Sequence, residues 1–253
     1  MNFRIIPCLL LSNGGLVKTE KFRKPKYVGD PINAIRIFNE KEVDELIVID
    51  IDASAKGSEP DFDLIEQLAS ECFMPMGYGG GVKTLDQAKR IFDLGIEKVV
   101  LQSVLATDRQ LVRQIAELYG SQAVVASVDV KRDWLGRRKI FCKSGVKFPF
   151  ASWQDMVVEF VREGAGEVLL NAVDLDGTRL GMDLDMVEEA SKLVDVPITA
   201  IGGVGKLQDF KFARDAGASA AAAGAFFVFQ GTHRAVLISY PRRHELLELW
   251  AQA

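Results

Sequence analysis

Short apolar runs rich in β-branched residues alternate along the chain with segments whose apolar residues recur every three or four positions. The runs predict strands buried on both faces, and the segments between them predict helices with one buried face. Strands are expected over residues 4–10, 46–52, 73–77, 98–102, 123–129, 167–174, 197–201 and 218–223. The clearest helical patterns cover residues 85–94, 108–118, 153–163 and 184–193.

Eight strands that alternate with helices predict an α/β protein with a parallel sheet covered by helices, and closure into a (β/α)8 TIM barrel is the expected result. A doubly wound open sheet is the structural alternative. The 253 residues suit one such barrel, and no linker-like segment divides the chain, so we expect a single domain over residues 1–253.

The second half of the chain resembles the first. Pro75 and Gly95 match Pro197 and Gly217 at one common separation of about half the chain, and each proline precedes a glycine cluster. A repeat of this length predicts two half-barrels related by pseudo-twofold symmetry, about residues 1–120 and 121–253.

Composition narrows the possible functions. A net charge of −4 and a pI near 5.4 argue against a nucleic-acid-binding surface. Three cysteines without a CxxC pair and two histidines favour neither a disulfide framework nor a metal site, and we expect no cofactor. No signal sequence is recognisable and the longest apolar stretch, residues 218–229, is too short to span a bilayer, so the expected location is the cytoplasm.

Candidate binding residues follow the expected strands, because the reactive face of such barrels lies at the carboxyl ends of the strands. Glycine turns there let backbone N–H groups and a helix N-terminus approach a phosphate. We define a first cradle, Gly80, Gly81, Gln102 and Ser103, and a second cradle, Gly177, Gly202, Gly203, Gly224 and Ala225. Two facing cradles suggest a substrate with a phosphate at each end; the alternative is that the glycines only turn the chain.

Asp129, at the end of the fifth expected strand and close to Lys131, is a candidate general acid or base. The alternative is a carboxylate that caps a loop or pairs with a lysine. The half-barrel repeat aligns Asp129 with Leu10 on the first strand, and leucine cannot carry a proton. The site therefore has one carboxylate where the symmetry allows two.

Several motifs together resemble the cyclase subunit of imidazole glycerol phosphate synthase over nearly the whole chain. They are the segment 4–9 (RIIPCL), residues 29–31 (GDP), 44–46 (DEL), 79–81 (GGG) and 174–178 (DLDGT). The resemblance implies a glutaminase partner at the N-terminal face of the barrel. Ammonia would cross the core to a doubly phosphorylated ribulosyl substrate, giving imidazole glycerol phosphate and an aminoimidazole carboxamide ribotide.

The resemblance also implies roles for single residues. Four charged residues match the family's ammonia gate at the barrel floor: Arg4, Glu45, Lys98 and Glu167. The alternative is an ordinary ionic network that closes the floor. Lys18 and Asp176 match family positions that line the substrate site, and Asp129 matches one of the family's two catalytic aspartates. Asp50 is assigned to the substrate site because it ends an expected strand.

Three departures stand out. The second catalytic aspartate falls on Leu10, Gln102-Ser103 replaces Asn-Thr, and Gly224-Ala225 replaces Ala-Ser. Loss of a catalytic acid predicts impaired cyclisation beside an intact ammonia gate.

This pattern, with the C-terminal segment 231–241, resembles paralogues linked to surface-polysaccharide genes, in which a third protein uses the ammonia to make an acetamidino sugar. We therefore expect an ammonia-channelling barrel. The alternatives are a genuine cyclase of histidine biosynthesis, with Asp50 or Asp176 as substitute acid, and a scaffold that activates the glutaminase.

Overall fold

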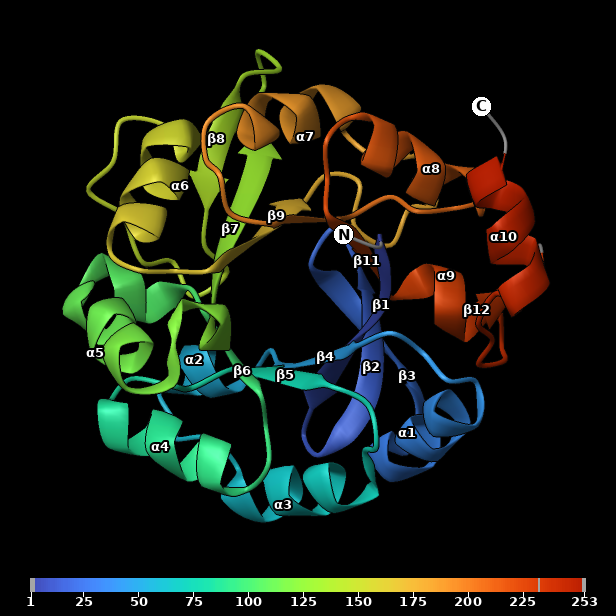
Figure 1. Ribbon diagram of the computed structural model, residues 1–253, viewed down its shortest axis with the longest axis horizontal. Helices are drawn as coiled ribbons and strands as arrows, with labels where there is room; N and C mark the ends of the chain where they lie inside the picture. The colour runs from blue at the N-terminus through green and yellow to red at the C-terminus, as the bar shows by residue number, and fades with distance from the viewer. Residues whose placement is uncertain (1–2, 232, 252–253) are drawn as a thin grey trace.

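The computed structural model describes residues 3–231 and 233–251, and it shows eight parallel strands closed into a barrel (Figure 1). Each strand pairs with the next, and the last pairs with the first through a register that joins Arg4 to Ala220. The barrel strands are β1 (Arg4–Ser12), β4 (Leu46–Asp50), β5 (Met76–Gly79), β6 (Lys98–Leu101), β7 (Val124–Arg132), β9 (Glu167–Ala172), β10 (Ile198–Ile201) and β11 (Ala220–Ala223). The expected TIM barrel is confirmed.

Helices surround the barrel (Figure 1). They are α1 (Pro31–Glu40), α3 (Phe62–Glu71), α4 (Leu85–Asp93), α5 (Gln110–Tyr119), α6 (Trp153–Arg162), α7 (Leu184–Ser191), α8 (Gln208–Asp215) and α10 (Arg243–Ala251). Short turns of helix are α2 (Ala53–Lys56), α9 (Ala225–Val228), η1 (Ser103–Ala106) and η2 (Ser121–Ala123). Side-chain hydrogen bonds to backbone N–H groups cap the N-termini of several helices. Thr84 and Ser152, for example, are the N-caps of α4 and α6 and form capping boxes there.

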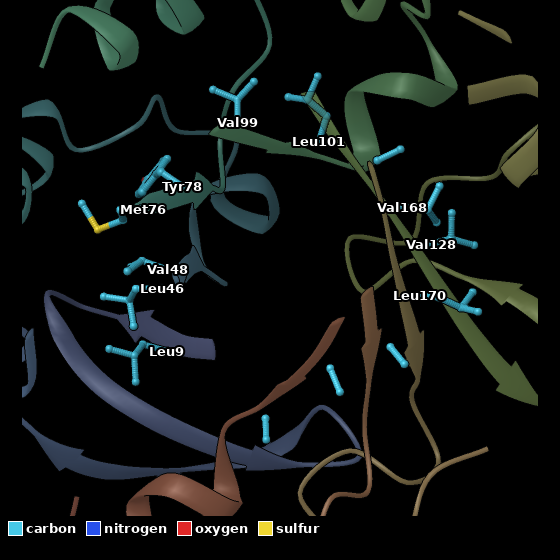
Figure 2. Close-up of a cluster of buried hydrophobic side chains, with 14 of the residues drawn as sticks. Leu9, Leu46, Val48, Met76, Tyr78, Val99, Leu101, Val128, Val168 and Leu170 are labelled. Atoms are coloured by element: carbon cyan, nitrogen blue, oxygen red, sulfur yellow. The ribbon is translucent and has the colours of Figure 1, made fainter. Parts of the chain in front are cut away.

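The strands bury apolar side chains on both faces. The outer side chains pack against the helices, and Figure 2 shows ten labelled members of this layer, among them Leu9, Tyr78 and Leu170. The inner side chains form a separate cluster in the lumen: Ile6, Cys8, Ile47, Val100, Val125, Leu169, Ile201, Ala220 and Ala222. Continuous burial explains why the strands read as apolar runs rather than as alternating patterns.

Five further strands were not predicted. β2 (Gly15–Glu20) and β3 (Arg23–Gly29) form an antiparallel hairpin on β1, and β8 (Arg138–Phe141) pairs with the extended end of β7. β12 (Phe229–Gln230) and β13 (Ala235–Val236) form a small two-stranded sheet after the barrel. Many residues of β3 and β8 are polar and partly exposed, so these strands lack the apolar signal of the barrel strands.

Some predicted strand limits were wrong. The third barrel strand begins at Met76 rather than at Phe73, whose side chain is exposed. The fifth continues past Asp129 to Arg132, because the extra residues pair with β8. Apolar residues in the sequence indicate which positions are buried, but not where the hydrogen bonding of a strand begins and ends. The strand limits therefore could not be predicted from them.

Matching glycines of the two halves adopt similar backbone angles. Gly80 and Gly202 have φ of 118° and 103°, and Gly95 and Gly217 both have 96°. These positive angles suit glycine because it lacks Cβ. Among the described residues, no helix is both long and apolar enough to cross a membrane.

Candidate functional site

The four charged residues expected at the barrel floor form one closed ring. Lys98 Nζ lies 2.6 Å from Glu45 Oε1 and 2.9 Å from Glu167 Oε2. Arg4 Nη2 lies 2.9 Å from Glu167 Oε1, and Arg4 Nη1 pairs with Glu45. Each member stands at or just before the start of a barrel strand, so the ring lies at the amino ends of the strands.

The ring is largely shielded from water. Glu45 and Glu167 are 3% and 5% exposed, and the Thr199 hydroxyl also donates to Glu167. Burial alone would raise the pKa of Glu167, but Lys98 and Arg4 outweigh it and hold the pKa below its usual range. Two cations and two carboxylates therefore neutralise one another at the floor.

Along the lumen, the ionic ring, the apolar layer and a pocket follow one another, and one strand can contribute a residue to each. On β9, Glu167 belongs to the ring, Leu169 to the apolar layer, and Asn171 to a pocket at the carboxyl end. On β6, Lys98 and Val100 follow the same order, because alternate residues of a strand point to one face, and Gln102, directly after the strand, lines the pocket.

The pocket at the carboxyl ends of the strands has a volume of about 510 Å³. Its floor contains Cys8, Val100 and Leu169 of the lumen layer, so the pocket opens directly above the apolar core. Both Leu10 and Asp129 line it. The leucine therefore faces the same space as the candidate acid–base residue, as the repeat predicts.

Asp129 is buried, and its pKa lies well above the usual range of a carboxylate. Burial is the main cause that raises its pKa to about 7, and the nearby Asp176 acts in the same direction. Gln102 Nε2 donates to Asp129 Oδ2 at 2.6 Å and opposes the rise, and the neighbouring Asn171 side chain also acts to lower the pKa. A group with this pKa can both accept and release a proton near neutral pH.

Gln102 is held by a second contact. Cys142 Sγ lies 3.4 Å from Gln102 Oε1, so the thiol donates to the carbonyl oxygen and leaves the amide nitrogen to face Asp129. Neither Cys142 nor Asn171 could be identified from the sequence as part of the site, since neither belongs to a motif. The β7–β9 register sets Asn171 beside Asp129, and the pairing of Phe141 with Asp129 across β8 and β7 brings the next residue, Cys142, close to the same site.

The two cradles differ in whether their residues face the pocket. All four residues of the first cradle line the pocket, and Ser54 adds a hydroxyl 3.4 Å from Ser103 Oγ. In the described chain, none of the residues of the second cradle lines it, and all of them are buried. Strand β2 covers this cradle: Lys18 and Thr19 lie against the faces of Gly224 and Gly177.

The remaining predicted residues have identifiable partners. Lys18 Nζ pairs with Asp176 Oδ1 at 3.0 Å, with both side chains 6% exposed, at the pocket wall. Asp50 lines the pocket but its Oδ1 accepts the backbone N–H of Asp52 at 2.8 Å. Lys131 lies over the ring of Phe141 at 5.0 Å.

The segment 231–241, apart from Thr232, which lies outside the described residues, returns to the barrel floor. Tyr240 Oη donates to the carbonyl oxygen of Ile5 at 2.9 Å and lies 3.4 Å from Asp44 Oδ2. Tyr240, near the end of the segment, therefore lies at the same face as the ionic ring. Among the described residues, no group of three or more His, Cys, Asp or Glu side chains could hold a metal ion.

Comparison with known proteins identifies the family. The model of the histidine biosynthesis protein family matches residues 4–234. The chain belongs to this family.

Its relatives in the family carry names of one enzyme. A Pseudomonas aeruginosa protein, provisionally named imidazole glycerol phosphate synthase subunit hisF2, is 51% identical over 245 residues, which are 96% of this chain and 97% of the relative. A Leptospira interrogans protein, provisionally named subunit HisF of that synthase, is 47% identical over 96% of both chains. The Exiguobacterium sibiricum subunit HisF is 38% identical over 88% of this chain and 90% of its own. The expected membership of the cyclase-subunit family is confirmed.

Proposed function

We propose that this chain is the ammonia-receiving barrel of a glutamine amidotransferase complex. A glutaminase would dock at the amino ends of the strands, and ammonia would pass the ring of Arg4, Glu45, Lys98 and Glu167 into the lumen. The closed ring carries this proposal: removing two carboxylates and most of two cations from water costs free energy, which favours a role beyond stability. The apolar layer above it suits a small neutral molecule.

We infer that the nitrogen leaves the barrel for a separate acceptor, which a third protein converts from an N-acetyl to an acetamidino sugar of a surface polysaccharide. Leu10 supports this inference, since it lines the pocket where the cyclase family has a catalytic aspartate. The substitute acids considered from the sequence have other partners: Asp176 pairs with Lys18 and Asp50 accepts backbone N–H groups.

Ring closure to imidazole glycerol phosphate is the second candidate. It is favoured by Asp129, whose pKa of about 7 suits general acid–base catalysis, and by the first cradle in the pocket wall. The phosphorylated substrate would then bind with one end at Ser103.

An assay with the ribulosyl substrate and excess ammonium salt separates the two candidates. We expect the native chain to turn over at most slowly, and Leu10→Asp to raise the rate by about 10²–10⁴-fold, the usual contribution of a positioned acid or base. Leu10→Asn is the matched control, since asparagine has the shape of aspartate but cannot exchange a proton. Robust turnover by the native chain would reject the sugar-amidination proposal.

Coupling to a glutaminase tests the passage itself. In the complex with its co-purified glutaminase, Glu167→Gln should lower the fraction of glutamine nitrogen that reaches the acceptor, while Glu188→Gln on the exposed face of α7 should not. If Glu167→Gln left the fraction of transferred glutamine nitrogen unchanged, the ring would not act as an ammonia gate. Glutaminase activation without any nitrogen transfer would favour a scaffold.

A further inference from the structure

Three basic residues lie at the mouth of the pocket. Arg23, Lys24 and Lys143 line the pocket and are exposed, so they lie where it opens to water. They belong to neither glycine cradle, and we call them the mouth cluster. Among the described residues, no carboxylate forms an ion pair with any of the three, whereas Lys18, the other cation of the pocket wall, pairs with Asp176. The mouth cluster therefore carries positive charge without a counter-charge.

An aromatic contact joins the two segments that supply the mouth cluster. Arg23 and Lys24 begin β3, and Lys143 follows the end of β8. The rings of Phe22 and Phe141 meet edge to face, with their centroids 5.9 Å apart. Phe22 directly precedes Arg23, and Phe141 stands two residues before Lys143. Cations that are far apart in the sequence are therefore held at one opening.

The turn before β3 adopts an unfavourable backbone conformation. Lys21, Phe22 and Lys24 have φ of 52°, 60° and 49°, in the left-handed region that favours glycine. The Lys21 N–H donates to the carbonyl oxygen of Asp176 at 2.9 Å, which attaches the turn to the pocket wall. Side chains kept at positions where glycine would cost less, beside a pocket, indicate a role in binding.

The carboxylates of the pocket wall are engaged elsewhere. Asp52 and Asp176 form ion pairs with lysines outside the mouth cluster, at 2.9 and 3.0 Å. Asp50 accepts two backbone N–H groups. Asp129, whose pKa is about 7, is partly protonated at neutral pH. The attraction of the mouth cluster is therefore left for an anion that arrives from solution.

We propose that the mouth cluster is an anion-binding site that takes the phosphate or diphosphate group of a small molecule. Arg23 offers a planar fork of N–H donors to two oxygens, and Lys24 and Lys143 add point charges. Leu10 and Ile201 make part of the wall apolar, so an uncharged portion of the same molecule fits inside the pocket. This site goes beyond the proposed ammonia passage and does not depend on it.

The test measures the binding of inorganic pyrophosphate to the full-length chain by isothermal titration calorimetry, near pH 7 and at constant ionic strength. Pyrophosphate has the charge of a diphosphate group without an attached molecule. We expect saturable binding by the native chain. Lys24→Gln and Lys143→Gln should each weaken it about fivefold, the change expected for one ion pair at contact distance in water, and the double variant about 25-fold.

Two controls isolate the charge and its position. Lys143→Arg keeps the cation and should stay within about twofold of the native affinity. Lys41→Gln removes an exposed lysine after α1, which forms no ion pair with a described carboxylate and does not line the pocket. It should bind pyrophosphate as the native chain does. The substituted residues are exposed, so each variant should keep the native Tm.

Native affinity in the double variant, or an equal loss in Lys41→Gln, would overturn the proposal. Ser103→Ala identifies the competing site: a loss of binding there, with none in the mouth variants, would place pyrophosphate in the first cradle and reject the mouth cluster. Pyrophosphate binding needs neither glutamine nor ammonia, so a failure of nitrogen transfer would count against the proposed function alone.

Discussion

Removal of the Glu167 side chain tests whether the ion pairs of the ring stabilise the fold more than an exposed ion pair does. This carboxylate accepts from Lys98 at 2.9 Å, from Arg4 at 2.9 Å and from the Thr199 hydroxyl. Glu167→Ala leaves two largely shielded cations, Arg4 and Lys98, with one carboxylate, Glu45. Breaking such a pair costs about 3–5 kcal/mol in free energy of unfolding.

The matched control is Glu188→Ala. Glu188 pairs with Lys192 at 2.6 Å on α7, but the two side chains are 56% and 71% exposed, so the loss should be a few tenths of a kcal/mol. Since about 1 kcal/mol shifts the Tm by about 2–4 °C in a chain of this size, Glu167→Ala should unfold roughly 10 °C lower and the control within about 1–2 °C.

Urea unfolding as a function of pH adds a second readout. The folded pKa of Glu167 lies below its unfolded value, although burial opposes this, so its stabilising contribution is present above the unfolded pKa. It is lost as the pH falls through the folded pKa. The difference between native chain and Glu167→Ala should therefore shrink in acid. Equal destabilisation by Glu167→Ala and Glu188→Ala at neutral pH would refute the account of the ring.

Three further predictions concern the pocket and the floor. Because the folded pKa of Asp129 is raised to about 7, its ionisation destabilises the fold as the pH rises from about 4 to above 7. At pH 8, Asp129→Asn should therefore unfold at a higher urea concentration than the native chain. At pH 4, the two should unfold at the same urea concentration. Gln102→Leu removes a 2.6 Å donor and should raise the pKa of Asp129 further, measured by carboxyl NMR; an unchanged pKa would contradict this. Tyr240→Phe removes the bond to Ile5 and should cost about 0.5–1.5 kcal/mol in urea unfolding, with Tyr27→Phe, at an exposed tyrosine, as control.

The barrel strands could be predicted from the sequence because burial on both faces leaves a strong apolar signal. The hairpin of β2 and β3 could not, because exposed Arg23, Lys24 and Lys26 make β3 look like a loop. The limits of β5 were missed because Met74 is buried without belonging to the strand.

The site was predictable where residue type and strand position agree. The ring was predicted from the resemblance to the cyclase family, whose charged residues fall at the starts of expected strands here, and Leu10 was singled out by its alignment with Asp129 in the repeat. Access to the second cradle was not predictable, since Lys18 and Thr19 reach it from another element. The partners of Asp129 depend on register across β6, β7 and β9, which no local pattern encodes.

The alanines of β11 have a practical consequence. Ala220 and Ala222 contribute only methyl groups to the lumen, so they are the smallest side chains of its apolar layer. Ala222→Leu would insert an uncharged plug between floor and pocket at a strain of about 1–3 kcal/mol, leaving the ionic groups and Asp129 in place. Such a variant would block the passage of ammonia through the lumen but leave the reacting groups of the pocket unchanged. Product formation should therefore fall when glutamine is the nitrogen source and recover when ammonium is added externally.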